Sequence, residues 1–527
     1  MDQLSAQDAQ FLYMEDSDVV ASITAVQICD QSTAPGGTVR FKDIIARIES
    51  RLSHSPIYNR HLMRVPMELD FPYWVEDPHF DIENHIRHAR LPEPADWRQF
   101  CIHVARYHSR PLDMGRPLWE AYVVEGLDNL EGVPKGSFAL IFKLHHAAVD
   151  GASAAQFLGT LWDVTPDGIP ALPVEPAVAG HGSHAPTLPG TLMRAAVNNA
   201  RSPVRMTQAV MRASPKISRA LINAGRSRLR KSGGVPKTVF NGKVGQQKVF
   251  DAAKFKLSDI KIIRTAYPEA KVNDVVLAVC SGGVRRYLQA KDALPNDSLV
   301  TTAPINTRGN GGADGVEGGG NNISAMTVPL HTNIAHPVER LKAIVLSTRK
   351  TKAAKEGLAA RLMTDLTQHV PAATMALASR LVIQNSNAAQ NISNLTISNV
   401  PGPQLPLYFC GAKLVTGYGL APLANGMGLF ISTPSYNGEI TFGVTSSRAI
   451  MPDIAFFIQC LEESFGELLA AATRRLDVTT EKEDAASPEA KPKRRRTRIT
   501  RVSETGKSAH TKSAQRNKAN GKARPSA

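Results

Sequence analysis

The chain has 527 residues, 43% of them hydrophobic, and carries a formal net charge of +15 at pH 7. This length exceeds that of a typical single domain and the hydrophobic content is ample for packed cores, so we expect two folded lobes. The five cysteines are scattered without a CxxC pair, which argues against a disulfide framework or a metal knot.

Nothing in the sequence resembles a membrane span or a secretory signal. The first residues, MDQLSAQDAQFLYMEDSD, carry acidic side chains and no basic region. No apolar run approaches the roughly 20 residues that a bilayer-spanning helix needs. We therefore expect a soluble or peripheral cytoplasmic protein.

Residues 1–165 mix strand-like and helix-like patterns. Apolar runs predict strands at 19–29 and 138–144, and amphipathic spacing predicts helices at 39–52 and 96–112. We assign these residues to an N-terminal lobe.

Residues 166–250 are predicted to be a basic linker between the lobes. From Pro176 to Phe250 there is no Asp or Glu, but there are 13 Lys or Arg. Apolar and basic residues recur at partly helical spacing, interrupted by Pro203 and Pro215. Such a segment is typical of a membrane-surface helix or a site for an anionic partner, and equally of a solvated connector.

Residues 251–475 resume the mixed pattern and are assigned to a C-terminal lobe. Helices are predicted at 271–290 and 453–476, with strands at 299–305, 323–330, 394–400, 427–433 and 439–447. Strands and helices on both sides of the linker indicate two α/β lobes.

The remaining residues, 476–527, form a strongly basic tail. Residues 491–527 contain 13 Lys or Arg and one acidic residue, whereas the chain before them contains 49 basic and 46 acidic residues. With few apolar residues, the tail is predicted to be disordered.

Two adjacent histidines end the predicted strand at 138–144, in the pattern His145-His146-x-x-x-Asp150-Gly151. Histidine has an unperturbed pKa of about 6.5, so it accepts a proton readily near neutral pH. A carboxylate close in sequence can orient the ring. The pattern therefore indicates a general base.

Other readings of these histidines stay open from local chemistry alone. A histidine at a strand end is often a hydrogen-bonded core residue. A zinc site is a further alternative, but the helical His-Glu-x-x-His arrangement is absent. Neighbouring strand residues point to opposite faces, so at most one of the two histidines should enter a given cavity.

Further motifs occur in a fixed order around this one. They are Leu4-Ser5-x-x-Asp8-x-x-Phe11-Leu12-x-x-Glu15, Trp74 to Pro92, Pro117-Leu118-Trp119, Asn273-Asp274, Pro304 to Arg308, Gly320-Asn321, Ser398 to Pro403 and Ser435-Tyr436-x-Gly438. Over about residues 1–475 the chain thereby resembles the bacterial wax ester synthase/acyl-CoA:diacylglycerol acyltransferases. This family belongs to a wider group with chloramphenicol acetyltransferase and peptide-synthetase condensation domains. The glycine-rich segment 309–320 and the tail depart from the pattern.

The resemblance implies an α/β fold of two chloramphenicol acetyltransferase-like lobes, in which helices flank mixed sheets and a tunnel between the lobes holds the active site. It also implies transfer of a long acyl chain from coenzyme A to the hydroxyl of diacylglycerol or of a fatty alcohol. Neither a Gly-x-Ser-x-Gly elbow nor a cysteine in the motif is present, so direct attack in a ternary complex is expected.

Roles for the central motif follow from the resemblance and the spacing. His146 is the proposed base, and His145 supports the site or packs beneath it. Asp150 is an orienting residue, with Arg308 as its hypothetical partner. Gly151 fits a tight turn after the strand.

The flanking motifs are given site-shaping roles. Pro117, Leu118 and Trp119 are expected to shape the lobe near the tunnel. Asn273 is implied to lie near the acyl-transfer centre, although with Asp274 it also fits a helix cap.

No metal and no cofactor is expected besides acyl-CoA as co-substrate. The expected partners are acyl-CoA and diacylglycerol or a fatty alcohol. A lipid surface is also expected, reached through the basic segments: either the inner face of the cell membrane or lipid inclusions. The alternatives are a condensation-type transferase that uses carrier-bound acyl groups, and a non-enzymatic binder of lipid or nucleic acid, the latter through the tail.

Overall fold

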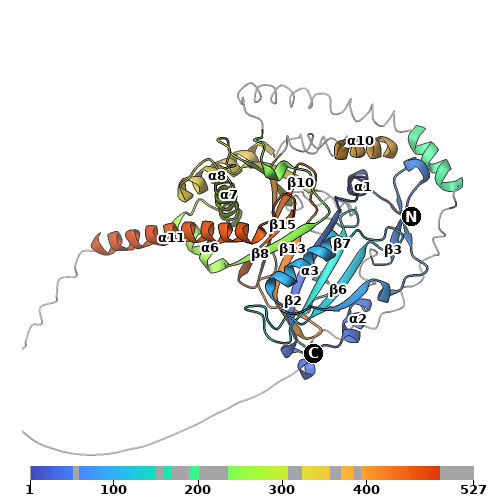
Figure 1. Cartoon of the computed structure of the whole chain (residues 1–527), viewed down its shortest axis with the longest axis horizontal. Helices are drawn as coiled ribbons and strands as arrows, with labels where there is room; N and C mark the ends of the chain where they lie inside the picture. Colours follow the sequence, from blue (N-terminus) through green and yellow to red (C-terminus); the bar gives the residue numbers. More distant parts are fainter. Residues whose placement is uncertain are drawn as a thin grey trace, which may run out of the picture. The chain divides into compact units, whose positions relative to one another are not determined.

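The computed structural model describes residues 2–51, 58–149, 159–167, 187, 189–200, 235–306, 323–355, 370–384 and 393–486 (Figure 1). Residues up to Val478 belong to one compact unit. The described residues after Val478 continue the last helix.

The first sheet carries the two histidines. Its six strands follow the order β12 (Tyr408–Phe409), β13 (Ala412–Leu420), β2 (Ser22–Asp30), β7 (Phe138–His145), β6 (Trp119–Glu125) and β5 (Ile86–Arg90). Strand β7 pairs antiparallel with both β2 and β6, and all eight of its residues are buried. A continuous apolar run suits such a central strand, because both of its faces are covered.

The second sheet is mixed. Its order is β10 (Ile323–Pro329), β9 (Val300–Asn306), β11 (Leu395–Val400), β14 (Leu429–Tyr436), β15 (Glu439–Ser447) and β8 (Lys248–Lys256). Strand β11 runs parallel to both of its neighbours, β9 and β14, and the other pairs are antiparallel. A third, small sheet has the order β1 (Asp2–Gln3), β4 (Tyr73–Glu76) and β3 (Arg60–Met63).

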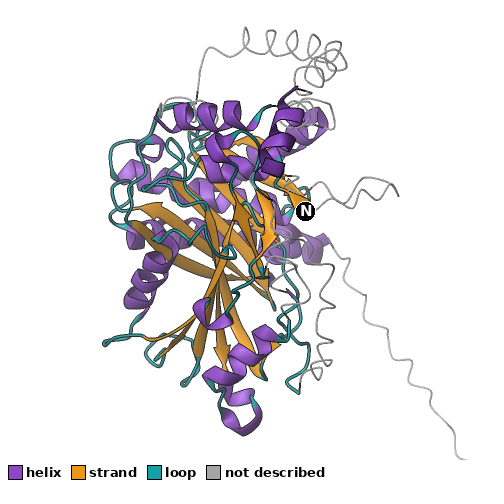
Figure 2. Cartoon of the chain, turned by 90° about the vertical axis from the view of Figure 1, so that its right-hand side faces the viewer, coloured by secondary structure: helices purple, strands orange, loops and turns teal. Residues whose placement is uncertain are grey.

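Helices cover the sheets (Figures 1 and 2). They are α1 (Ala6–Tyr13), α2 (Phe41–Glu49), α3 (Trp97–Ser109), α6 (Leu257–Ala266), α7 (Val272–Ala290), α8 (Pro337–Lys355), α10 (Ala372–Gln384), α11 (Ile454–Ala486) and an unlabelled helix at 189–200. Among these helices none has the length and apolar character that crossing a bilayer requires.

Each face of the first sheet packs against a different helix. On one face, Ile44 of α2 belongs to the same buried cluster as Phe142 of β7. On the other, Phe100 of α3 belongs to a cluster with Ile141. Alternate residues of β7 therefore enter opposite cores, as the period of a strand requires. Helices α7 and α11 contribute to the core of the second sheet.

Helix α3 also joins the two large sheets. The Trp97 indole Nε1 donates to Asp251 Oδ1 in β8 at 2.8 Å. Burial raises the pKa of this carboxyl group above its usual value. Because Phe250 of β8 enters the core beneath α3, the two sheets share one continuous packed region.

The C-terminal half of the chain supplies two strands, β12 and β13, to the first sheet, which the sequence did not indicate. Strand β13 lies within the range assigned to the C-terminal lobe but pairs antiparallel with β2 of the first sheet. Strand β8 begins at Lys248, inside the segment predicted as linker, and forms the edge of the second sheet. The final helix extends to Ala486, beyond its predicted end at 476. The rest of the predicted tail lies outside the described residues.

Glycines permit the close approach where β13 crosses the second sheet. A Cβ atom on Gly443 of β15 would lie 2.8 Å from the carbonyl oxygen of Gly419 in β13. That obstacle is backbone, so no side-chain rotation can relieve it. Strand β13 was not predicted, because glycines at 417 and 419 lower its strand propensity.

The α/β fold class is confirmed, and most predicted elements occur close to their expected positions. Strands β2, β7, β9, β10, β11, β14 and β15 and helices α2, α3, α7 and α11 correspond to predicted segments. Strand β6 was missed, because its sequence WEAYVVE contains acidic residues at both ends of a short apolar run.

Candidate active site

The histidine pair is held rigidly by both neighbouring strands. The His145 backbone N–H donates to Leu118 O at 3.0 Å, and the His146 N–H donates to Ala21 O at 2.8 Å. His145 is the last residue of β7, and His146 opens the turn that follows. The backbone of the pair is thus fixed at the end of the central strand.

His145 is fully buried and faces a carboxylate. Its Nε2 lies 3.4 Å from Glu15 Oε2, and its Nδ1 accepts a hydrogen bond from the Ala147 N–H at 3.0 Å. Because Nδ1 accepts, we assign a ring proton to Nε2, which points toward Glu15. The other oxygen of Glu15 accepts from the Ala21 N–H at 3.1 Å.

His146 is partly exposed and lies against an aromatic ring. Phe11 of α1 stacks on the His146 imidazole with ring centroids 3.9 Å apart and planes inclined by 13°. Stacking of this kind holds one face of the imidazole and limits its rotation. The structure therefore distinguishes the two histidines: His145 is enclosed and His146 is accessible.

The opening motif of the sequence explains how Phe11 and Glu15 reach the histidines. Ser5 is the N-cap of α1, where its hydroxyl accepts from the Asp8 N–H at 3.1 Å and donates to Asp8 Oδ2 at 2.6 Å. Leu12 packs into a buried cluster one residue after Phe11. The motif therefore spans one helix, from its N-cap Ser5 to Glu15, two residues after the helix ends. The sequence analysis identified the motif but assigned no role to Phe11 or Glu15.

Leu118 and Trp119 are fully buried beside the histidine turn. The Trp119 indole Nε1 donates to Tyr58 O at 3.0 Å, and the Trp119 carbonyl accepts from His85 Nδ1 at 2.8 Å. Leu118 carries the carbonyl that binds the His145 backbone. This segment therefore positions the end of β7 through packing and backbone contacts.

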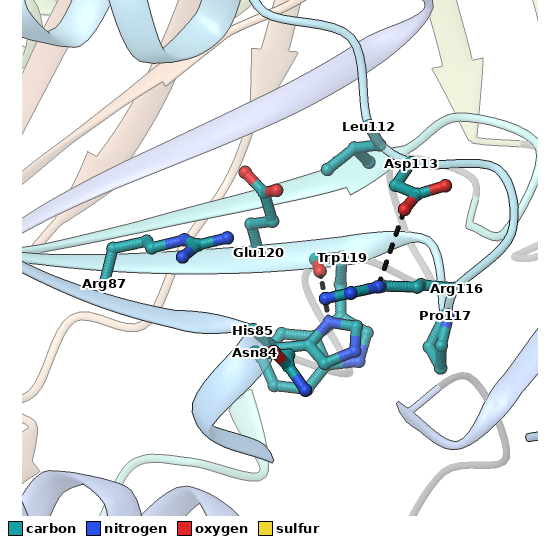
Figure 3. A pocket seen from close by; sticks show the side chains of 9 residues that line it. All are labelled: Asn84, His85, Arg87, Leu112, Asp113, Arg116, Pro117, Trp119 and Glu120. Carbon is teal, nitrogen blue, oxygen red and sulfur yellow. Dashed lines mark hydrogen bonds and ion pairs between the residues drawn. The ribbon is translucent and has the colours of Figure 1, made fainter. Parts of the chain in front are cut away.

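A cavity of about 220 Å³ opens next to this segment (Figure 3). It is lined by Asn84, His85, Arg87, Leu112, Asp113, Arg116, Pro117, Trp119 and Glu120. Arg116 Nε lies 3.5 Å from Asp113 Oδ2, and burial lowers the pKa of His85. Neither histidine of the pair lines this cavity, so we do not assign the reaction to it.

Buried cationic groups lie on the α3 side of β7. The Lys143 Nζ donates to Tyr107 O at 3.0 Å and to Arg110 O, carbonyls at the end of α3. Burial lowers the pKa of Lys143 to about 8. Burial, together with the charges of Lys143 and Lys248, lowers the pKa of His108 to about 3. Lys143 and His145 are two residues apart on one strand and so share a face.

Asn273 and Asp274 begin helix α7. The Asp274 carboxylate accepts from the Lys271 N–H at 2.9 Å and from Thr348 Oγ1 at 2.7 Å. Asp274 therefore closes the first turn of α7 from its third position, whereas the N-cap residue is Lys271 and not the predicted Asn273–Asp274 pair. Asn273 is the second residue of the helix and is half-buried.

Two motifs far apart in sequence meet at the ends of β11 and β14. The Gly402 N–H donates to Ser435 Oγ at 3.3 Å, and Val400 is registered against Pro434. A Cβ atom on Gly402 would lie 2.2 Å from Ser435 O. The contact requires glycine and favours a structural role for both motifs.

Three predicted site residues, Asp150, Gly151 and Arg308, lie outside the described residues. Within the described ranges there is no cluster of three or more His, Cys, Asp or Glu side chains suited to hold a metal ion.

The arrangement of the two large sheets is shared with solved structures of other proteins. The first condensation domain of the calcium-dependent antibiotic synthetase matches with a TM-score of 0.51 and 13% identity, covering 89% of this chain and 96% of that domain. At this identity the likeness concerns the fold alone. The chain has the two-lobed chloramphenicol acetyltransferase-like fold.

Within that fold class, the chain belongs to the wax ester synthase/diacylglycerol acyltransferase family. The family's catalytic-domain model matches residues 4–276, and its C-terminal-domain model matches residues 319–469. The chain is accordingly an acyltransferase.

Individual relatives agree with this assignment. A Mycobacterium tuberculosis H37Rv protein, provisionally named a diacylglycerol O-acyltransferase, is 30% identical over 89% of this chain and 90% of its own length. The structure of the wax ester synthase/diacylglycerol acyltransferase from Marinobacter aquaeolei VT8 is 27% identical, with a TM-score of 0.63 over 90% of this chain and 100% of that one.

Proposed function

We propose that this protein transfers a long-chain acyl group from acyl-CoA to the hydroxyl of diacylglycerol or of a long-chain alcohol, with His146 as general base. The observation that carries the proposal is the contrast within the histidine pair. His145 is enclosed, with the Ala147 N–H at its Nδ1 and Glu15 near its Nε2. His146 is partly exposed and stacks on Phe11.

The reaction balances with His146 alone moving the proton. A ring nitrogen of His146 takes the hydroxyl proton while the alcohol oxygen attacks the thioester carbonyl carbon. The tetrahedral intermediate collapses, the carbon–sulfur bond breaks, and the imidazolium returns the proton to the departing CoA sulfur. A positioned base contributes about 10²–10⁴-fold to such a step.

His145 supports this base through the backbone. The Ala147 N–H donates to Nδ1 of the His145 ring, and Glu15 lies 3.4 Å from its Nε2, so both contacts help to position the turn that carries His146. His145 and Glu15 are positioning residues in this scheme, and Phe11 restrains the His146 ring.

The remaining roles are those expected from the motif. Asp150 orients His146 with Arg308 as its partner, Gly151 permits the turn, and Asn273 lies near the reacting groups. These assignments are supported by the family's motif pattern in the sequence.

Acyl-CoA acts as co-substrate, and the acceptor comes from a lipid phase. The condensation-type alternative is less well supported, because both family models match the chain and the likeness to a condensation domain reaches only 13% identity. A purely binding function leaves the buried Glu15–His145 pair without a purpose.

The test is an acyl-transfer assay with radiolabelled palmitoyl-CoA and either dioleoylglycerol or hexadecanol. Wild type should form neutral lipid, and His146→Ala should reduce the rate by at least about 10²-fold. His336→Ala, which removes an exposed histidine outside the family motifs, serves as the matched control and should retain full activity. If wild type forms no product with either acceptor, or if His146→Ala equals wild type, the proposed function fails.

A further inference from the structure

The helix at 189–200 exposes its apolar side chains, whereas an ordinary surface helix buries them. Its apolar side chains Met193 and Val197 are 69% and 39% exposed. Thr191 and Ala195, small or polar residues, are 3% and 1% exposed. A surface helix normally turns its apolar stripe toward the core. This helix presents that stripe to the outside.

The helix is nevertheless well anchored. Asn198 Nδ2 donates to Asp70 Oδ2 at 2.8 Å, and Asn199 Nδ2 donates to Leu69 O at 2.7 Å. Ala195 belongs to a buried cluster with Val65 and Tyr73. Polar contacts and a small residue thus fix the inner face, so the outward apolar face is a built feature of the fold.

Two neighbouring elements expose further large apolar side chains. Met67, in the short helical turn η5 (Pro66–Glu68), is 81% exposed, and Leu377 of α10 is 60% exposed. Helix α10 contacts η5, which directly precedes the Leu69–Asp70 segment that anchors helix 189–200. We call the set of these exposed side chains the apolar surface: Met67, Leu192, Met193, Val197 and Leu377.

The apolar surface is connected to the catalytic histidine by one helix. Helix α10 packs on α1, where Gln10 Nε2 lies 3.6 Å from Met375 Sδ (Figure 1). The next residue of α1, Phe11, stacks on His146. A lipid held at this surface would therefore lie at the His146 end of the first sheet.

The charge around the apolar surface is positive. Arg64, Arg194 and Arg380 are exposed, and the described parts of helix 189–200 and of α10 contain no acidic residue. The nearby acid Glu68 is engaged by Arg64 at 3.2 Å and by the Tyr13 hydroxyl at 3.1 Å. Basic side chains around exposed apolar ones fit the headgroups and acyl boundary of an anionic phospholipid layer.

We propose that the apolar surface inserts into a phospholipid layer and docks the enzyme there, so that the acyl acceptor reaches His146 from the lipid phase. The purpose of the docking rests on the proposed function, but the docking itself does not. Large apolar side chains that are exposed on neighbouring elements in this way point to an interaction site.

The experiment is flotation of the full-length protein with vesicles of phosphatidylcholine, with and without phosphatidylglycerol. Met193→Ser/Val197→Ser and Leu377→Ser should each weaken vesicle partitioning by about tenfold, because they remove inserted apolar area. Leu346→Ser is the matched control, since Leu346 is an exposed leucine (57%) on α8, and it should bind as wild type does. Equal melting temperatures show that each variant is folded.

High salt separates the contribution of the apolar surface to vesicle binding from that of the basic tail, which all variants share. At about 1 M salt the Debye length is about 3 Å, so attraction by the tail is screened while apolar insertion persists. The difference between Leu377→Ser and Leu346→Ser should therefore remain at high salt.

Three outcomes decide the proposal. Equal vesicle binding by wild type, Met193→Ser/Val197→Ser and Leu377→Ser overturns it. So does a change from dimer to monomer in these variants, seen by sedimentation without lipid, since a second copy would then cover the surface. His146→Ala should lose activity and keep vesicle binding; if wild type is inactive but its binding still depends on Leu377, the docking stands and the proposed function fails.

Discussion

Replacement of Glu15 by glutamine tests whether the buried carboxylate positions the turn that carries His146. The substitution keeps the size of the side chain and an oxygen that can accept from the Ala21 N–H, but it removes the charge 3.4 Å from His145 Nε2. Both side chains are shielded from water, with exposed fractions of 11% for Glu15 and 0% for His145. The variant therefore alters the interaction with His145 and also removes the attraction between Glu15 and the buried Lys143.

The magnitude follows from the geometry. The 3.4 Å separation is longer than an ordinary N–H···O hydrogen bond, so we assign the attraction between Glu15 and the His145 ring about 1.4 kcal/mol, below the range of about 1.5–3 kcal/mol for a hydrogen bond to a charged group. If that orientation energy is lost from the transition state, kcat falls about tenfold, since each 1.36 kcal/mol is one factor of ten. KM for palmitoyl-CoA should not change, because Glu15 is assigned no contact with substrate.

The assay is steady-state acyl transfer to dioleoylglycerol, with thermal unfolding as a parallel measurement. Glu131→Gln, at an exposed position outside the family motifs, is the matched control and should match wild type in kcat. Glu15→Ala should lower both kcat and the melting temperature, because it also leaves the Ala21 N–H without its acceptor. A kcat within about twofold of wild type for both Glu15 variants, or a change in KM alone, would refute the positioning role.

Two further predictions concern stability. The lowered pKa of His108, about 3 in the folded protein against 6.5 unfolded, means that the unfolded state binds more protons between these values, so stability falls as pH drops through this window. Between pH 7 and about pH 4.5, the free energy of unfolding of His108→Gln should therefore fall by about 3 kcal/mol less than that of wild type. The control His79→Gln should lose as much unfolding free energy as wild type. Equal losses for His108→Gln and wild type would contradict the burial of His108. Gly443→Ala should destabilise by about 1–3 kcal/mol in urea unfolding, because its Cβ would meet the Gly419 carbonyl at 2.8 Å. Gly466→Ala on α11, where a Cβ meets nothing within 4 Å, should be neutral or stabilising. An equal effect of the two substitutions would contradict the close approach of β13 to β15.

Much of the local structure follows from the sequence because burial leaves a periodic pattern. The apolar run of β7 predicts a central strand, and the helical spacing at 271–290 predicts α7 almost to the residue. The histidine motif likewise stands out as residue types in a short spacing. These signals are local, and local spacing is what a sequence displays directly.

The partners of these elements depend on contacts between distant residues. Periodicity shows that a strand has a buried face but not which strand lies beside it. For this reason the sequence does not predict that β13 pairs with β2, nearly 400 residues away. It also does not predict that β8, which begins within the predicted linker, joins the second sheet. The basic residues at 176–250 suggest a surface segment, but only the fold shows that the helix at 189–200 turns its apolar side outward.

The inequality of the two histidines illustrates the same division. By itself the sequence determined that His145 and His146 end a buried strand and project in different directions. Only the tertiary structure decided that Glu15 encloses His145 and that Phe11 lies against an accessible His146. The reason is physical: both partners come from the first 15 residues, about 130 positions away, and only packing of α1 against the end of β7 brings them there.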